Sequence, residues 1–218
     1  MRVIVTGVTG MVGEGVMHEM LNKPEVKEVL ALSRKSSGYS HPKLKEILHQ
    51  DFFDISSISA DLKNYDACFF CLGVSSVGMK EQEYHKLTYE LTLHVAETLS
   101  KNNPQMTFCY VSGAGTDSSE KGKSMWARVK GKTENHLAKL PFKAVYNFRP
   151  GFILPIEGMK FTNKFYKYVN WLFPIGRLIY PKGFCKLTEI AEAMYKVSME
   201  GYSKQNVEGD DIISLWQV

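Results

Sequence analysis

Three glycines near the start of the chain constrain its fold more than any other feature. A β-branched stretch at residues 2–5 is followed by Gly7, Gly10 and Gly13, and apolar residues at helical spacing then run over 11–21. Strand, glycine turn and helix in this order are typical of a dinucleotide-binding unit. There the first glycine allows a sharp turn, the second lets a pyrophosphate approach the backbone, and the third brings helix and sheet together. We therefore predict that a nucleotide diphosphate binds at the amino end of this helix.

Length and composition indicate one ordinary globular domain. The chain has 218 residues and is 44% hydrophobic, and no apolar run reaches the roughly 18 residues of a membrane span. The first residues already form a core strand, so we expect no signal peptide and no transmembrane segment, and hence a cytoplasmic protein. The net charge of +4 is spread along the chain, which argues against a nucleic-acid partner but suits a phosphate-rich ligand.

The four cysteines predict neither a metal site nor a disulfide. Cys68 and Cys71 form a C-x-x-C motif inside an apolar segment that we interpret as a buried strand. Side chains three residues apart on a strand point to opposite faces, so this pair cannot share a metal ion. Cys109 and Cys185 are isolated and consistent with a reducing compartment.

Alternating strand and helix patterns over residues 1–150 predict an α/β fold, a doubly wound parallel sheet of the Rossmann type. We treat residues 1–218 as a single domain in which 152–218 form a small C-terminal substrate lobe. Further strands are expected at 27–33, 45–49, 66–72, 106–112 and 142–148, a weak helix at 55–62, a long helix at 80–102, a helix around 123–134, a helix at 189–200 capped by Thr188, and a short closing element at 209–213.

The glycine turn has the form T-G-x-x-G-x-x-G, which resembles the short-chain dehydrogenase/reductase superfamily, in particular its extended and atypical members, often described as NAD-dependent epimerase/dehydratase-like. The resemblance implies that Asp51 hydrogen-bonds the adenine amino group, that Phe52 packs on the ring, and that the segment after the fourth strand lies beside a cofactor ribose. It also implies that the loop after the sixth strand passes the nicotinamide carboxamide, although a plain proline turn predicts the same geometry.

The end of the second strand decides between the two coenzymes. A carboxylate there favours NAD, whereas a basic side chain neutralises the 2′-phosphate of NADP. The chain has Ser33, Arg34 and Lys35 at this point and no carboxylate beside them. We therefore predict NADP(H), with NADPH preferred over NADH and Arg34 as the main phosphate contact. The alternative is that Arg34 and Lys35 are a solvated loop pair.

The candidate cofactor-binding residues share one property, a position at the carboxyl end of a predicted strand or on the helix that follows it. They are Thr6, Gly7, Thr9, Gly10, Met11, Val12, Gly13, Ser33, Arg34, Lys35, Asp51, Phe52, Cys71, Leu72, Gly73, Lys130, Pro150, Gly151 and Ile153.

The candidate catalytic residues are Ser112, Trp126 and Lys130. In the superfamily that the chain resembles, the helix around 123–134 carries Y-x-x-x-K, in which tyrosine transfers a proton and lysine holds the ribose. The register fits Lys130, but Trp126 occupies the tyrosine position. An indole N–H only donates and does not titrate in the useful range. The proton could instead come through Lys130, through water, or from another tyrosine such as Tyr84.

Two functions of different classes follow. The first is an NADP(H)-dependent oxidoreductase or epimerase-like enzyme acting on a small organic substrate, as a possible homodimer. The second is a cofactor-binding sensor or partner-binding protein without turnover. The aromatic and basic segment 161–184 fits a cover over the substrate pocket, which we favour, or a face for a partner or membrane surface. Pro174 and Gly176 argue against one long interfacial helix there.

Overall fold

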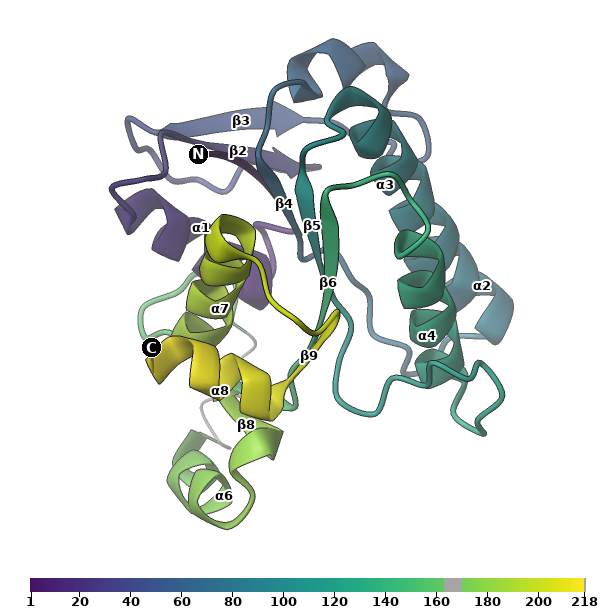
Figure 1. Ribbon diagram of the computed structural model, residues 1–218, viewed down its shortest axis with the longest axis vertical. Helices are drawn as coiled ribbons and strands as arrows, with labels where there is room; N and C mark the ends of the chain where they lie inside the picture. Colours follow the sequence, from purple (N-terminus) through teal and green to yellow (C-terminus); the bar gives the residue numbers. More distant parts are fainter. Residues whose placement is uncertain (163–169, 218) are drawn as a thin grey trace.

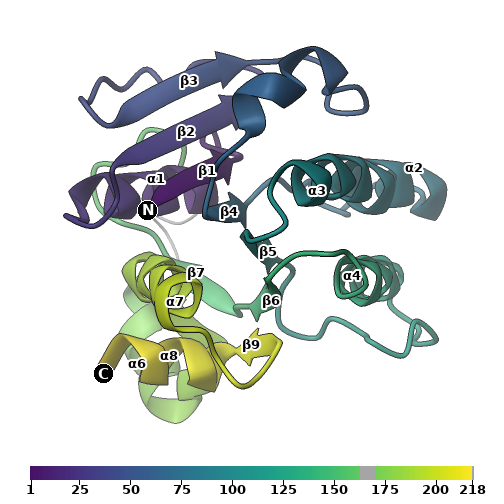
Figure 2. The ribbon, with the colours of Figure 1, turned by 45° about the horizontal axis from the view of Figure 1, so that its top comes forward.

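A seven-stranded sheet whose neighbouring strands are all parallel forms the centre of the molecule. The structure, a computed structural model, describes residues 1–162 and 170–217. The strand order is β3-β2-β1-β4-β5-β6-β9, so the chain winds outward from β1 in both directions (Figures 1 and 2). The strands are β1 (Arg2–Thr6), β2 (Glu28–Ser33), β3 (Leu44–Leu48), β4 (Ala67–Phe70), β5 (Thr107–Val111), β6 (Ala144–Arg149) and β9 (Asn206–Glu208). The predicted doubly wound parallel sheet is confirmed.

Helices cover both faces of this sheet. Helices α1 (Met11–Asn22) and α7 (Leu187–Glu200) lie on one face, and α3 (Leu91–Asn102) and α4 (Met125–Leu137) lie on the other (Figure 2). Successive side chains of a strand point to opposite faces. Val3 and Val5 accordingly pack in the core beneath α1 and α7, while Ile4 packs in the core beneath α3. All three side chains are fully buried, as expected for a parallel strand covered on both sides.

The remaining elements connect these layers or form the C-terminal part. They are η1 (Ser56–Leu62), α2 (Glu81–His85), the π-helical turn η2 (Lys86–Glu90), β7 (Phe152–Leu154), η3 (Asn170–Leu172), α6 (Phe173–Ile179), η4 (Pro181–Gly183), β8 (Phe184–Lys186) and α8 (Gly209–Gln217). Strands β7 and β8 pair in parallel as a separate small sheet. Residues after 151 therefore supply this small sheet together with one strand and two helices of the main α/β unit.

Three sequence-based expectations about these elements need correction. The long helix at 80–102 is present but contains the turn η2, and the weak helix at 55–62 is a 3₁₀ helix. The short closing element expected at 209–213 is present as the start of α8, which β9 precedes. Thr188 does not cap α7. The helix begins at Leu187, two residues before the predicted start, and the backbone N–H of Lys186 donates to the Glu189 carboxylate at 2.9 Å.

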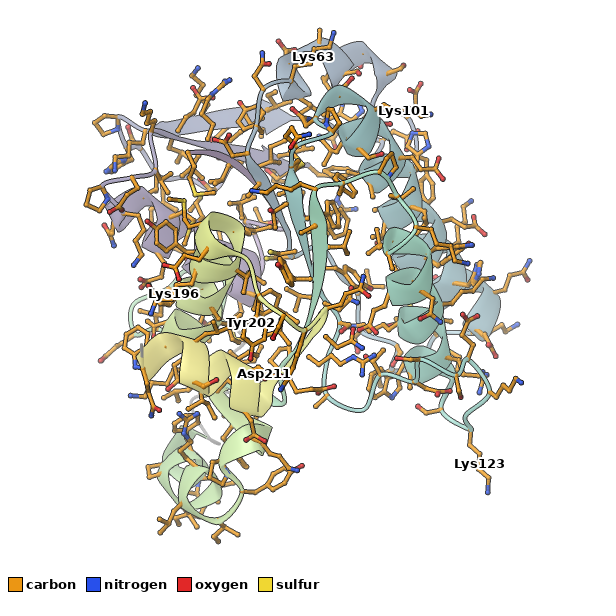
Figure 3. All side chains as sticks on the ribbon, in the orientation of Figure 1. Lys63, Lys101, Lys123, Lys196, Tyr202 and Asp211 are labelled. Atoms are coloured by element: carbon orange, nitrogen blue, oxygen red, sulfur yellow. The ribbon has the colours of Figure 1, made fainter. Side chains whose placement is uncertain are left out.

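Hydrogen bonds from its neighbours hold α8 in place. The Tyr202 hydroxyl donates to the Asp211 carboxylate at 2.8 Å, and Lys196 on α7 donates to the carbonyl of Leu215 at 2.8 Å. Figure 3 shows the labelled Lys196, Tyr202 and Asp211 where α7 and α8 meet. Across the described residues, 1–162 and 170–217, no helix combines the length and apolarity needed to cross a bilayer.

Cys68 and Cys71 lie on opposite sides of the sheet, as predicted. Cys68 is fully buried in the core beneath α3, whereas Cys71 packs against the core beneath α1. Both thiols are free. Burial raises the pKa of each thiol, so neither is poised as a nucleophile.

Candidate active site

Two of the three glycines in the first turn are required by the protein itself. Gly7 has φ +71°, and a Cβ there would lie 2.6 Å from the carbonyl oxygen of Cys71. A Cβ on Gly13 would lie 2.2 Å from the carbonyl oxygen of Gly7. Both distances are far below van der Waals contact, so a side chain at either position would push β1, β4 and α1 apart.

Two other glycines in the same region are not required by the fold. Gly10, at the N-cap of α1, has φ −128°, which any residue adopts, and a Cβ there would meet only the Gly7 carbonyl oxygen, at 3.4 Å. A Cβ on Gly73, after β4, would have no atom within 4 Å. Gly10 is exposed at the first turn of α1, where helix N–H groups lack intrahelical partners. The space beside these two glycines is therefore open to a ligand.

A cavity of about 230 Å³ opens beside Gly73. Residues after the ends of β2, β3 and β4 line it, together with Leu87 of η2 and Leu91 at the start of α3. Its lining residues are Arg34, Gln50, Asp51, Phe52, Phe53, Leu72, Gly73, Val74, Leu87 and Leu91. The structure thus brings together five of the residues singled out for cofactor binding. A mostly apolar cavity with a few polar groups has the character of a small-molecule site.

The turn after β2 is ordered by its own hydrogen bonds. The Ser33 hydroxyl donates to the carbonyl of Lys35 at 2.6 Å, and the Gln50 amide donates to the carbonyl of Arg34 at 2.7 Å. The carboxylate that reaches this turn belongs to Glu46, and it accepts hydrogen bonds from Ser36 and Ser37. The Arg34 side chain remains exposed at the rim of the cavity.

Asp51 and Phe52 occupy different environments at the end of β3. The Asp51 carboxylate is exposed and accepts the backbone N–H of Phe53 at 2.9 Å. Phe52 is buried in the core beneath α3 and reaches the cavity from below. Asp51 therefore stands at the cavity mouth, whereas Phe52 forms part of its floor.

The segment Pro150–Gly151 packs tightly against the C-terminal part. The Pro150 carbonyl accepts the N–H of Ala114 at 2.9 Å, and a Cβ on Gly151 would lie 2.4 Å from the carbonyl oxygen of Gly183. Ile153 lies in β7, opposite Cys185 of β8. This packing explains the glycine without a ligand.

Helix α4 brings Lys130 beneath the loop that leaves β5. Its ammonium group donates to the backbone carbonyl of Ser112, whose own hydroxyl donates to the Phe148 carbonyl at 3.1 Å. Burial lowers the pKa of Lys130 to about 8, against the opposing effect of the Glu134 carboxylate. The half-buried Trp126 lies against Gly115, with its ring 3.7 Å from where a Cβ on that glycine would be.

Tyr84, one of the three proton sources left open by the sequence, is 2% exposed on α2. Burial raises the pKa of its hydroxyl. This tyrosine is part of the interior and does not face an open site.

A buried ion-pair network beneath α4 was missed by the sequence reasoning. Arg149, at the end of β6, donates to both carboxylate oxygens of Glu134, to Glu208 at 3.0 Å and to the Ser118 hydroxyl at 2.6 Å. Arg149 and Glu134 are both buried. Glu134 lies one turn after Lys130, so the network fixes the helix that carries Lys130. The sequence did contain one indication of this network, because the carboxylate of Glu134 follows the predicted site residue Lys130 by four positions.

Glu14 is a second buried charge that the sequence did not reveal. Its carboxylate, fully buried on α1, accepts the Tyr39 hydroxyl at 2.6 Å and the backbone N–H groups of Lys160 and Phe161 at 2.7 and 2.8 Å. It ties the segment after β7 to the helix of the glycine turn.

Comparison with known proteins gives a consistent family. The model of the NAD dependent epimerase/dehydratase family matches residues 3–125, more than half of the chain. The chain is 27% identical over 159 residues to "Protein fmp52, mitochondrial" of Emericella nidulans, an alignment that covers 70% of this chain and 66% of that relative. It therefore spans just under two thirds of the length of that relative.

Solved structures with low identity show the same fold. Thermoplasma acidophilum aldohexose dehydrogenase superposes with a TM-score of 0.69 at 14% identity, covering 97% of this chain and 94% of that one. The Bordetella bronchiseptica enzyme WbmF, in complex with NAD+ and UDP, has a TM-score of 0.65 at 15% identity, with coverage of 94% and 70%.

The cytoplasmic location expected from the sequence is contradicted by these comparisons. The Emericella nidulans relative and the similar proteins from Meyerozyma guilliermondii, Saccharomyces cerevisiae and Candida albicans are all named mitochondrial. The expectation rested on an N-terminus that is already a core strand, and that feature does not determine the compartment.

Proposed function

This chain belongs to the NAD-dependent epimerase/dehydratase family, and from that premise we propose that it binds NADP(H) and acts as an oxidoreductase or epimerase-like enzyme on a small organic substrate. The observation that carries the binding proposal is the pair Gly10 and Gly73. Neither glycine is needed by the fold, and both border open space at the carboxyl ends of strands. A dinucleotide explains them because its pyrophosphate and ribose need bare backbone at these two points.

The preference for NADP rests on the turn after β2. Arg34 is exposed beside the cavity, and the carboxylate near this turn, Glu46, is already engaged by Ser36 and Ser37. An arginine at this strand end binds a 2′-phosphate through charge-assisted hydrogen bonds. In this proposal Ser33 and Lys35 shape the same subsite, Asp51 receives the adenine amino group and Phe52 lies beneath the ring.

Lys130 is the group that we propose for proton transfer. A bound nicotinamide would supply the hydride chemistry. An ordinary lysine holds its proton too firmly at neutral pH to serve as an acid, whereas burial lowers the pKa of Lys130 to about 8. Its ammonium proton can pass to a substrate oxygen, after which solvent returns a proton to the amine. In this proposal Trp126 would shape the substrate pocket, and the backbone carbonyl of Ser112 orients Lys130.

The second candidate is cofactor binding without turnover. Trp126 favours it, because indole cannot replace the phenol that relatives use as the acid. The Ser112 hydroxyl also points inward, to the Phe148 carbonyl, and is 5% exposed.

Calorimetric titration with NADPH and NADH tests the binding proposal. We expect NADPH to bind more tightly, and Arg34→Ala to weaken NADPH binding by about 10- to 100-fold while changing NADH binding little, because only NADPH carries the 2′-phosphate. Lys63→Ala, which removes a distant exposed cation, is the matched control. Equal affinities for the two coenzymes, unchanged in Arg34→Ala, would refute the NADP assignment.

Turnover is tested separately with NADPH and a panel of aldehydes and ketones. Loss of wild-type turnover in Lys130→Met, in a variant that still binds NADPH, supports the enzyme proposal. A silent wild type together with a Trp126→Tyr variant that gains reductase activity would favour the protein without turnover.

A further inference from the structure

One side of helix α6 packs against the rest of the molecule. Phe173 is buried, with its ring 6.0 Å from that of Phe184 in β8. Gly176 leaves room for the same ring, since a Cβ there would lie 2.2 Å from it. Arg177 donates to both carboxylate oxygens of the buried Glu189, at 3.0 and 2.9 Å. Residues at 173, 176 and 177 thus form an inward stripe that holds the helix firmly.

The opposite stripe of this segment is apolar and faces solvent. Trp171, Ile175, Leu178 and Ile179 are exposed by 66%, 50%, 84% and 77%. Their spacing places them on one side of the helical segment 170–179, away from the inward stripe. Six of the ten exposed large apolar side chains in the described residues fall within 171–180. A surface helix normally turns polar residues outward, so an apolar outer stripe indicates an interaction surface.

The charge of the surrounding sequence has a single sign. Residues 158–188 contain six of the 27 Lys and Arg residues and none of the 23 Asp and Glu residues. The rest of the chain, with 21 cationic and 23 anionic side chains, is slightly acidic. Arg177 is paired with Glu189, so among the described residues the exposed cations beside α6 are supplied by Lys182 in η4 and Lys186 at the end of β8. These two lysines complement an anionic surface and disfavour contact with a second copy of the same face.

We propose that the outer stripe of α6, formed by Trp171, Ile175, Leu178 and Ile179, docks on the surface of an anionic lipid bilayer. Exposed apolar side chains with a tryptophan beside lysines are typical of segments that lie about 5–10 Å deep in the lipid headgroup region. The helix lies at the end of the molecule opposite β3 in both ribbon views, and no other described helix or strand extends past it there (Figures 1 and 2). Because the inward stripe already packs on the protein, α6 does not have to fold when the outer stripe binds.

Cosedimentation with large unilamellar vesicles tests this proposal on the full chain. We expect binding to phosphatidylcholine vesicles that contain phosphatidylglycerol, and much weaker binding to pure phosphatidylcholine. The double variant Leu178→Ser/Ile179→Ser should lower the partition coefficient at least tenfold, because it removes apolar contacts with the membrane interface. Lys182→Glu should lower it about fivefold or more, since each lysine near an anionic surface contributes attraction of that order.

Matched controls are available at the far end of the molecule. Leu48→Ser removes an exposed leucine from β3, and Lys63→Glu reverses an exposed charge that Figure 3 labels well away from α6. Neither should change vesicle binding. The proposal fails if wild-type protein stays in the supernatant with both vesicle types, or if the α6 variants bind as well as the controls. A dimer that Leu178→Ser/Ile179→Ser dissociates, without vesicle binding, would assign the stripe to a second copy and also overturn it.

Discussion

The glycine turn and helix α4 contain the residues proposed for nucleotide binding and for proton transfer, respectively. The two regions differ in how closely they match the pattern that the resemblance predicts. In the glycine turn all three glycines are present: close packing requires Gly7 and Gly13, whereas the space beside Gly10 is open. On α4, Trp126 occupies the position at which the resemblance predicts an acidic tyrosine, and Lys130 contacts a backbone carbonyl. In the proposed function, nucleotide binding and proton transfer are therefore separable properties, and only the second lacks a residue that the resemblance predicts.

The glycine turn and helix α4 also differ in the interactions that stabilise them. The turn depends on close approach of backbone to backbone, which leaves no freedom to substitute Gly7 or Gly13. Helix α4 depends on a buried charge network between Arg149 and Glu134. Backbone contact tolerates no side chain, whereas a charge network can be replaced by apolar residues of similar volume. Substitutions in the two regions should therefore differ in whether they can be rescued.

The largest effect should come from the glycine turn. Gly13→Ala would place a methyl group against the Gly7 carbonyl, so we expect the free energy of unfolding to fall by about 4 kcal/mol or more. Gly10→Ala should change stability by no more than about 0.5 kcal/mol, yet weaken NADPH binding at least tenfold by blocking the pyrophosphate. Urea denaturation and calorimetry measure the two quantities. A Gly10→Ala variant that binds NADPH normally would remove the argument for a ligand at this turn.

An effect of about 3–4 kcal/mol is expected from the network beneath α4. Arg149→Met alone leaves the buried Glu134 carboxylate without its cation, which is strongly destabilising. The double variant Arg149→Met/Glu134→Leu removes both charges and should recover most of the lost stability. A thermodynamic cycle over the two single variants and the double variant measures the coupling. If the double variant were as unstable as the sum of the singles, the two residues would not act as a pair.

The sequence predicted the structure correctly where a local residue pattern has a single physical cause. Glycines after a strand predicted the turn, and apolar runs predicted the strands of a sheet covered on both faces. Arg34, Asp51 and Gly73 could be assigned to one end of the sheet because the carboxyl ends of parallel strands meet there, and they do line one cavity.

Features that depend on partners distant in sequence could not be predicted. Arg149 was not singled out, because nothing local marks Glu134 and Glu208 as its partners. Glu14 was not singled out either, because the segments that bury it lie 25 and 146 residues away in the sequence. Part of the aromatic segment expected to cover the substrate pocket, 163–169, lies outside the described residues. In the part that is described, the inward stripe of α6 packs on β8.

The smallest effect, and the one most specific to α4, is the pH dependence of stability due to Lys130. Its pKa is lowered to about 8 in the folded protein from 10.5, so above pH 8 the unfolded chain binds more protons than the folded one. Stability should therefore rise between about pH 8 and 10.5, by on the order of 1–3 kcal/mol relative to Lys130→Met. Urea denaturation of both proteins at pH 7 and pH 10 measures this difference, because the other titrating groups cancel between them.

The exposed control Lys63→Met should follow wild type at both pH values, and Gly10→Ala should too, since the glycine turn contains no titrating group. Parallel curves for wild type and Lys130→Met would mean that Lys130 is as free to hold its proton as a surface lysine, and the contrast between the two halves of the site would then reduce to Trp126 alone.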